Sequence, residues 1–235
     1  MTIPQASTRI VHSELNNGTA VILRPITAED RELLRGGIKD LSADSRYLRF
    51  FSAAPNVPEN VIDRLVAVDG VNHVAWGAIC TGCDVPPYAM GAVHAVRNQE
   101  GSDRGEYSVA ILDQFHNQGL ARMLTSALLF DCEKVGFSAL DVFILAENRG
   151  AAALVKSMGA VRVGTDSGVN EYRLDVKIGL AALRGEKDVK GLAQVFRQLT
   201  PDKIARWIFL PTNDREISGI RNGAKAEALT PYSSA

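Results

Sequence analysis

One short segment of the sequence, LDQFHNQGLARMLTSALL at residues 112–129, places residues that suit a bound anion where a helix begins. A single glycine, Gly119, stands between the polar part of the segment and an apolar helical pattern. Arg122 falls in the first helical turn, and the small residues Gly119 and Ala121 allow close approach. The backbone amides at this helix start belong to Asn117, Gln118, Gly119, Leu120 and Ala121. The arrangement would suit a pyrophosphate, but from this loop alone an ordinary strand–loop–helix junction is the favoured interpretation.

The elements around this segment alternate single strands with helices. The strands are expected at residues 72–80, 88–97, 104–112, 139–145, 160–165 and 170–176. The first two form an antiparallel pair around the turn-rich TGCDVPP. The helix after the loop is expected to run through residue 135, where Gly136 ends it, and a second helix to span 148–159. This alternation indicates an α/β fold with a mixed, mostly antiparallel sheet wrapped by helices.

The two ends of the chain differ from this central part. Residues 1–18 are polar and are expected to be loosely ordered, whereas 19–176 contain the predicted domain. That domain opens with a strand and three helices, at 19–26, at 27–41 with Thr27 as N-cap, at 43–51 with Ser42 as N-cap, and at 58–69. Two amphipathic stretches, 177–199 and 201–210, begin a helical extension over 177–235. A homodimer formed through this extension is one expectation.

Composition narrows the class of protein. The chain has 235 residues, is 46% hydrophobic and carries a net charge of -1, which argues against a dedicated nucleic-acid or membrane-surface binder. No apolar run approaches the roughly 18 residues of a membrane span, and no signal core is apparent, so a soluble cytoplasmic protein is expected. Cys80 and Cys83 have the spacing of a metal-binding cysteine pair, but Cys132 is the one further cysteine and no second pair exists. We therefore predict neither a metal site nor a disulfide framework.

The anion loop and the segment after it resemble the GNAT superfamily of acyl-CoA N-acetyltransferases. The pyrophosphate loop of that family has Gln or Arg, two residues, Gly, one residue, and then Gly or Ala. The stretch HNQGLA matches at Gly119 and Ala121, with His116 in place of the leading residue. Further on, AENRGAAALVKSMGA is similar to the next family segment, where an Asn begins a helix and a Gly follows eleven residues later, here Asn148 and Gly159.

The N-terminal part is similar to one group within that superfamily. LRPITAEDRELL and LSADSRYLRFFS resemble the opening of the catalytic domain in bacterial protein lysine acetyltransferases of the Pat type. GEYSVAILDQFHNQGLA is similar to the strand and loop of the same group. The resemblance covers roughly residues 20–175. It implies acetyl-CoA as the acyl donor and direct transfer to an amine, without a covalent enzyme intermediate or a metal.

The resemblance also implies roles for particular residues. Glu106 stands where the group has a Glu at the start of this strand, and it is implied to be the general base; otherwise it is a solvated charge. Backbone groups of the same strand are implied to hold the pantetheine and polarise the acetyl carbonyl, and they belong to Val109, Ala110 and Ile111. Asn148 is implied to bind the cofactor, unless it caps its helix and does nothing more. Val155 stands where many members carry a Tyr general acid, so no general acid is assigned.

The resemblance favours a protein lysine as the acceptor, with acyl-CoA synthetases as the implied targets. Two alternatives stay open. One is a small-molecule amine acetyltransferase, and the other is a non-catalytic acyl-CoA-binding module that acts on a partner through the C-terminal helices.

Several other residues invite attention but have ordinary explanations. His73 and His94 are expected in the core or at an edge, and His116 near the phosphates is a further option. Arg46 and Arg49 are expected on a solvated helix face rather than facing an acidic substrate or a 3′-phosphate. Three large apolar residues of the tail, Trp207, Ile208 and Phe209, are expected to pack on the domain or on a second subunit.

Overall fold

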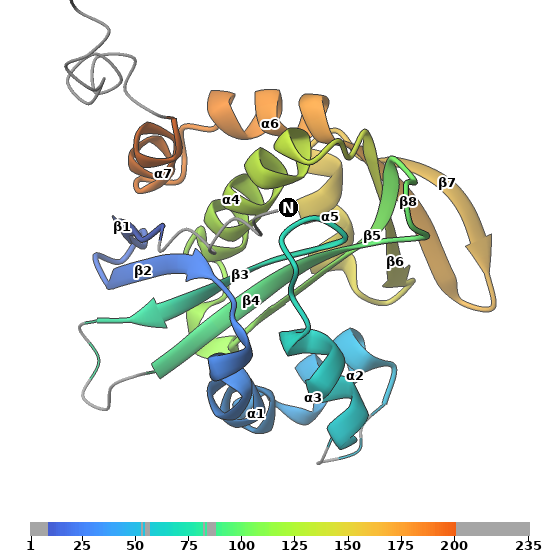
Figure 1. Cartoon of the computed structure of the whole chain (residues 1–235), viewed down its shortest axis with the longest axis horizontal. Helices are drawn as coiled ribbons and strands as arrows, with labels where there is room; N and C mark the ends of the chain where they lie inside the picture. Colours follow the sequence, from blue (N-terminus) through green and yellow to red (C-terminus); the bar gives the residue numbers. More distant parts are fainter. Residues whose placement is uncertain (1–8, 53, 55–56, 82, 84–87, 201–235) are drawn as a thin grey trace, which may run out of the picture. The chain divides into compact units, whose positions relative to one another are not determined.

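The structure of the protein, a computed structural model, describes residues 9–52, 54, 57–81, 83 and 88–200. Eight strands form one sheet in the order β1-β2-β3-β4-β5-β6-β8-β7 (Figure 1). Their bounds are β1 Val11–Glu14, β2 Ala20–Pro25, β3 His73–Cys80, β4 Tyr88–Arg97, β5 Arg104–Ile111, β6 Ala139–Leu145, β7 Val161–Asp166 and β8 Val169–Asp175. Neighbouring strands are antiparallel except β5 and β6, which are parallel. The predicted mixed, mostly antiparallel sheet is confirmed.

Helices cover both faces of the sheet. Their bounds are α1 Arg31–Asp40, α2 Ala43–Phe50, α3 Glu59–Val66, α4 Leu120–Lys134, α5 Arg149–Ser157, α6 Val176–Gly185 and α7 Leu192–Leu199. Helices α1 to α3 lie on one side of the sheet, and α4, α6 and α7 lie on the other (Figure 1). Helix α4 crosses β3, β4 and β5. Because it is sandwiched between the sheet and α6 and α7, its Met123, Leu124, Ala127 and Leu128 are all fully buried.

The N-terminal segment differs from the expectation. Val11–Glu14 form strand β1, which pairs antiparallel with β2, so a loosely ordered segment over 1–18 is wrong for these residues. The reason is an alternation that the polar composition conceals. Val11, Ser13 and Leu15 face inward and are buried, while the residues between them are exposed. Residues 1–8 lie outside the described part of the chain.

The first part of the C-terminal extension packs against the domain. Helix α6 begins at Val176, which is fully buried, and both α6 and α7 contact α4. Helix α7 also contacts β1, so elements from the two ends of the described chain meet at the β1 edge of the sheet. The amphipathic stretch at 201–210, with Trp207, Ile208 and Phe209, lies outside the described residues, and the expectation of a homodimer is untested.

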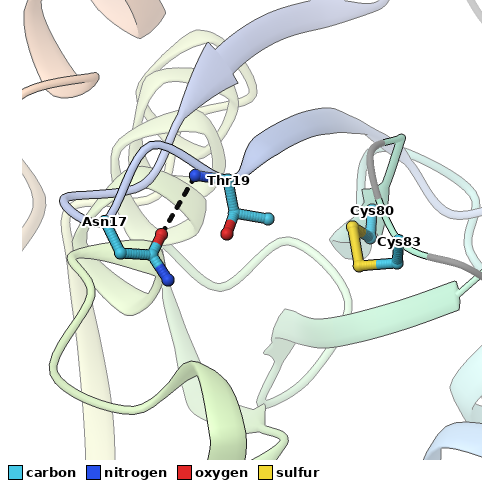
Figure 2. Close-up of a disulfide and its surroundings, with 4 residues drawn as sticks. All are labelled: Asn17, Thr19, Cys80 and Cys83. Atoms are coloured by element: carbon cyan, nitrogen blue, oxygen red, sulfur yellow. Dashed lines mark hydrogen bonds between the residues drawn. A yellow bond between two sulfur atoms is a disulfide. The ribbon is translucent and has the colours of Figure 1, made fainter.

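The cysteines correct a second expectation. Cys80 and Cys83 form a disulfide at the end of β3, shown in Figure 2, while Cys132 is free and buried. In the CTGC segment the two cysteines are therefore joined by a disulfide rather than present as two free thiols. Turn geometry is the reason, because it brings the two Cα atoms within 5.7 Å. The disulfide lies near the turn between β1 and β2, where the Asn17 side chain accepts a hydrogen bond from the Thr19 backbone (3.0 Å).

Candidate active site

Strands β5 and β6 stop pairing with each other near the middle of the sheet. They pair only at Arg104 with Ala139, Gly105 with Leu140 and Glu106 with Asp141, whereas β5 stays paired with β4 as far as Ile111. Beyond Glu106, the side of β5 that faces away from β4 has no ladder partner among the described strands. Backbone groups on this side of β5, apart from the Ile111 carbonyl that contacts His116, are therefore available to a ligand.

A cavity of about 810 Å³ adjoins this free part of β5. Its walls come from the end of β5, the following loop, the beginning of α4, helix α2 and helix α5. The predicted cofactor residues that line it are Val109, Ala110, Ile111, Asn117, Gly119, Leu120, Ala121, Arg122 and Asn148. Gln118 is not among the lining residues; its carbonyl accepts a hydrogen bond from Asn16 instead (3.1 Å). The structure thus brings two distant sequence segments to one cavity.

The loop before α4 has an unusual backbone. Asn117 and Gly119 both have positive φ, 58° and 88°, and Gly119 is the N-cap of α4. Asparagine and glycine are the residues that adopt this conformation most readily. The first amides of α4 have no partner within the helix. Together with the helix dipole, these amides make the lining residues Gly119, Leu120 and Ala121 a suitable cradle for an anion.

Two polar side chains flank this cradle. Arg122 lines the cavity, forms an ion pair with Glu186 (3.2 Å) and donates a hydrogen bond to the Ser157 hydroxyl (3.2 Å). Asn148 is the N-cap of α5, where its side-chain oxygen accepts a hydrogen bond from the Ala151 amide (3.0 Å). Because Asn148 also lines the cavity, the observed cap leaves its amide nitrogen available for a ligand.

His116, which replaces the leading Gln or Arg of the resembled motif, contacts protein backbone. Its Nε2 atom lies 2.8 Å from the Ile111 carbonyl, so the ring connects the loop to the end of β5. His116 also lines the cavity. We therefore assign the ring a role in holding the loop, with the Nε2–H tautomer as the donor.

Glu106 lies on the last rung that β5 and β6 share, outside the residues that line the cavity. Its side chain is exposed and forms no hydrogen bond or ion pair within the described part of the chain. By strand alternation it shares a sheet face with Ser108, whose hydroxyl accepts a hydrogen bond from Arg49 (2.8 Å). Burial lowers the pKa of Arg49, and the charge of Glu106 partly opposes this effect. Glu106 and Arg49 are therefore electrostatic neighbours beside the free part of β5.

The contribution of helix α2 was missed in the sequence. Ser45, Leu48 and Arg49 line the cavity, at spacings of three and four residues that put them on one helix face. Arg46 is buried and donates a hydrogen bond to the Leu41 carbonyl (3.3 Å). The solvated helix face expected for Arg46 and Arg49 is therefore wrong, because α2 packs its arginines against the domain. Helical periodicity around the second arginine was the signal that could have revealed this face.

Asp113 ties α2 to the loop that follows β5. Its carboxylate accepts hydrogen bonds from the hydroxyls of Ser42 (2.8 Å) and Ser45 (2.7 Å) and from the Ser42 amide (3.1 Å). Desolvation alone would raise the pKa of Asp113, but these hydrogen bonds lower it to about 2. The ionised carboxylate therefore holds α2 over the cavity across the whole neutral range.

A buried histidine pair lies next to this region. His73 Nε2 and His94 Nδ1 are 3.0 Å apart, and His73 Nδ1 lies 3.0 Å from the Ala67 carbonyl. Burial lowers the pKa of both rings, and the nearby Arg49 lowers that of His94 further. Both histidines are therefore neutral members of the core, as the sequence predicts.

Three further kinds of feature bear on function among the described residues: metal-binding clusters, tyrosine or cysteine side chains in the cavity, and membrane-spanning helices. The described residues contain no cluster of three or more side chains suited to holding a metal. No tyrosine or cysteine is among the described residues that line the cavity, and Val155 is buried. None of the described helices is both long and apolar enough to cross a membrane.

Comparison with known proteins gives a consistent result. No family model matches the chain. In sequence, the chain is 27% identical over 147 residues to an acetyltransferase of Pseudomonas aeruginosa, a match that covers 63% of this chain and 78% of the relative.

Solved structures share the fold. The GNAT domain of S. lividans PAT superposes with a TM-score of 0.65 at 20% identity, over 72% of this chain and 98% of that domain. Spermidine N-acetyltransferase from Vibrio cholerae, in complex with CoA and spermine, gives 0.52 at 15% identity, over 68% and 98%. A cAMP-binding acyltransferase from Mycobacterium smegmatis gives 0.50 at 16% identity over 85% of this chain, which spans 60% of that protein. The chain therefore has the fold of these GNAT acetyltransferases, and in sequence it is similar to an acetyltransferase.

Proposed function

We propose that the protein transfers the acetyl group of acetyl-CoA directly to the amine of a protein lysine, with Glu106 as the general base. The observation that carries the proposal is the cavity that joins the free part of β5 to the amides at the start of α4. One end of this cavity suits a pyrophosphate, and the other suits an extended chain that seeks backbone hydrogen bonds. Coenzyme A carries both groups, and the V. cholerae neighbour is a complex with CoA.

The donor would be held mainly by backbone. Gly119, Leu120 and Ala121 bind the pyrophosphate, with Arg122 supplying positive charge beside it. Val109, Ala110 and Ile111 hold the pantetheine and the acetyl carbonyl. An N–H group of this strand directed at the developing oxyanion would stabilise the transition state by roughly 3 kcal/mol. Asn148, which already caps α5, donates its amide to the donor.

The acceptor must lose a proton before it can react. A lysine side chain has a pKa near 10.4, so presenting its neutral amine at pH 7 costs about 4–5 kcal/mol. Glu106 accepts this proton, directly or through water, and passes it to solvent. The neutral amine nitrogen then attacks the acetyl carbon, the carbon–sulfur bond breaks, and Glu106 accepts the second proton that the nitrogen loses as the amide forms. Coenzyme A leaves as a thiolate, whose pKa near 8.5 permits departure without a protein acid.

The surroundings of Glu106 favour a protein side chain as acceptor. Glu106 is exposed and lies outside the cavity, so an amine reaches it from an open sheet face. A small amine would be better served by a closed pocket that surrounds it. The likeness to the GNAT domain of S. lividans PAT agrees with this choice. Acyl-CoA synthetases are the first proteins to test.

The test measures thiol release from acetyl-CoA with three acceptors: an acyl-CoA synthetase, a lysine peptide and spermidine. We expect turnover with the protein acceptor and at least a 100-fold lower kcat for Glu106→Gln. Glu100→Gln, which changes an exposed glutamate in the turn before β5, is the matched control and should keep full activity. Calorimetry should show that Glu106→Gln still binds acetyl-CoA.

Each other outcome changes the proposal in a defined way. Turnover restricted to spermidine would replace the protein acceptor with a small amine. Unchanged turnover in Glu106→Gln would remove the general base. Binding of acetyl-CoA without turnover on any acceptor would identify a non-catalytic acyl-CoA-binding module.

A further inference from the structure

Three segments that are distant in sequence meet behind the anion loop, and one asparagine connects them. They are the turn between β1 and β2, the loop at Gln118, and the linker between α6 and α7 at residues 186–191. We infer that Asn16, in the first of these segments, is a positioning residue that holds the loop in the conformation that binds the donor. This inference rests on the proposed function, because it assigns the loop to the pyrophosphate of acetyl-CoA.

Asn16 uses both its backbone and its side chain. Its backbone amide donates to the Gln118 carbonyl (3.1 Å). Its side-chain nitrogen donates to the Asp188 carbonyl (2.9 Å), and its side-chain oxygen accepts from the Lys190 amide (3.1 Å). A carboxamide carries one donor group and one acceptor group, so it satisfies both partners in a single orientation. Aspartate keeps the acceptor and loses the donor, and alanine loses both.

The linker held by Asn16 also touches the loop directly. A Cβ atom built at Gly119 would lie 2.6 Å from Val189 Cγ1, so the glycine lets Val189 pack against the loop backbone. Val189 is itself buried. A few residues away, Glu186 forms the ion pair with Arg122 (3.2 Å). The linker therefore contacts the loop at two points, and Asn16 fixes the linker to the turn behind it.

This support matters because of the loop's backbone. Asn117 and Gly119 both have positive φ, a conformation that a free chain would exchange for others. If the loop were free, binding would have to order it, and that cost would subtract from the affinity. Asn16 holds the loop before the donor arrives, so the amides of the anion cradle are already in place. The linker after α6, which follows the predicted domain, thereby becomes part of the donor site.

The experiment is calorimetric titration of the full chain with acetyl-CoA. We expect Asn16→Ala to raise the Kd about tenfold, which corresponds to the loss of one or two hydrogen bonds. Asn16→Asp should give a smaller rise, because the bond from Lys190 survives. Asn17→Ala is the matched control: it removes the neighbouring carboxamide, whose hydrogen bond within the described part of the chain is local, to Thr19, and it should leave the Kd unchanged.

The fitted stoichiometry distinguishes positioning from a loss of folded protein. A variant that is partly unfolded would bind less acetyl-CoA per chain, with the same Kd in the folded fraction. A positioning role predicts the reverse, full stoichiometry with a raised Kd. Equal Kd values for the parent and Asn16→Ala, or a fall in stoichiometry alone, would overturn the inference while leaving the proposed function intact. Failure of the parent to bind acetyl-CoA would overturn the proposed function and the inference together.

Discussion

Glu106 and Asp141 stand side by side on the last rung shared by β5 and β6, yet only one of the two carboxylates is paired. Asp141 is buried and accepts hydrogen bonds from Arg104 (2.6 Å) and Arg173 (3.1 Å). Glu106 is exposed, and no described residue donates a hydrogen bond to it. The two neighbouring acids therefore have different surroundings: Asp141 is held by hydrogen bonds, whereas Glu106 is free for the role of general base that we propose.

This separation predicts opposite phenotypes for two similar substitutions. Asp141→Asn should lower the free energy of unfolding by about 2–3 kcal/mol, because it weakens charge-assisted hydrogen bonds in a buried site. Glu106→Gln should leave the free energy of unfolding unchanged within about 0.5 kcal/mol, as expected for an exposed side chain. Urea unfolding at pH 7 measures both. Equal destabilisation by the two changes would contradict the separation.

The same site predicts a pH dependence. Burial alone would raise the pKa of Asp141, but hydrogen bonds from Arg104, Arg173 and Asn98 lower it below the usual value. A lowered folded-state pKa means that the contribution of Asp141 to stability is complete above the unfolded value near 3.9 and is lost as the pH falls through the folded value. As the pH is lowered from 5 to values below the unfolded pKa, the free energy of unfolding should therefore fall more for the parent than for Asp141→Asn. Unfolding at a series of pH values measures this difference.

Gly119 predicts a difference between two glycine substitutions. Gly101 and Gly119 both have positive φ, 77° and 88°, but a Cβ atom at Gly101 would meet nothing within 4 Å. Gly101→Ala should therefore cost about 1 kcal/mol, the cost of the conformation alone. Gly119→Ala should cost more and weaken acetyl-CoA binding, since its Cβ atom also collides with Val189. Thermal unfolding and calorimetry make the comparison, and equal melting temperatures would show that Val189 moves aside freely.

Asn148 allows its two roles to be tested apart. Asn148→Asp retains an oxygen for the Ala151 amide and should leave the melting temperature nearly unchanged. It should nevertheless weaken acetyl-CoA binding, because it replaces an amide donor with a negative charge. Asn148→Ala should lose about 1 kcal/mol of stability through the missing cap. If Asn148→Asp binds acetyl-CoA as well as the parent does, the residue caps α5 and has no contact with the donor.

The disulfide predicts a stability that depends on reductant. Closing so short a loop between Cys80 and Cys83 stabilises by about 2 kcal/mol in the chain-entropy account. Reductant should therefore lower the melting temperature of the parent and leave that of a Cys80→Ser, Cys83→Ser double variant unchanged. Mass spectrometry with and without alkylation confirms the redox state. The same melting temperature for the parent in both conditions would count against a stabilising disulfide.

Much of the fold follows from local patterns in the sequence. The helix after Gly119 and the hairpin of β3 and β4 are visible because each has a clear period and a clear end. Strand β1 is not, since four residues with polar neighbours gain their stability from pairing with β2 and packing against α7. The bond between Cys80 and Cys83 is equally hidden, because it depends on how the chain turns after β3.

The candidate site shows the same limit. The loop at Gly119 and the strand at Val109 are contiguous motifs, so a sequence pattern can identify them. Arg49 reaches the cavity through the packing of α2, and Asn16 reaches the loop through the pairing of β1. Such contacts are set by the tertiary fold: helical periodicity groups Arg49 with Ser45 and Leu48 on one face of α2, but it does not say what that face contacts.

Where β5 separates from β6, the inside of the sheet contains a stretch of strand edge that has no neighbouring strand among the described residues. Edges at the outside of a sheet invite pairing with other chains, whereas this one opens toward a cavity that a slender molecule can enter. Pantetheine carries amide groups much like those of a peptide, so the bound donor would serve as a substitute strand. If the proposed donor binds in this way, it would complete the sheet, and the folded state would gain stability with each increase in donor concentration.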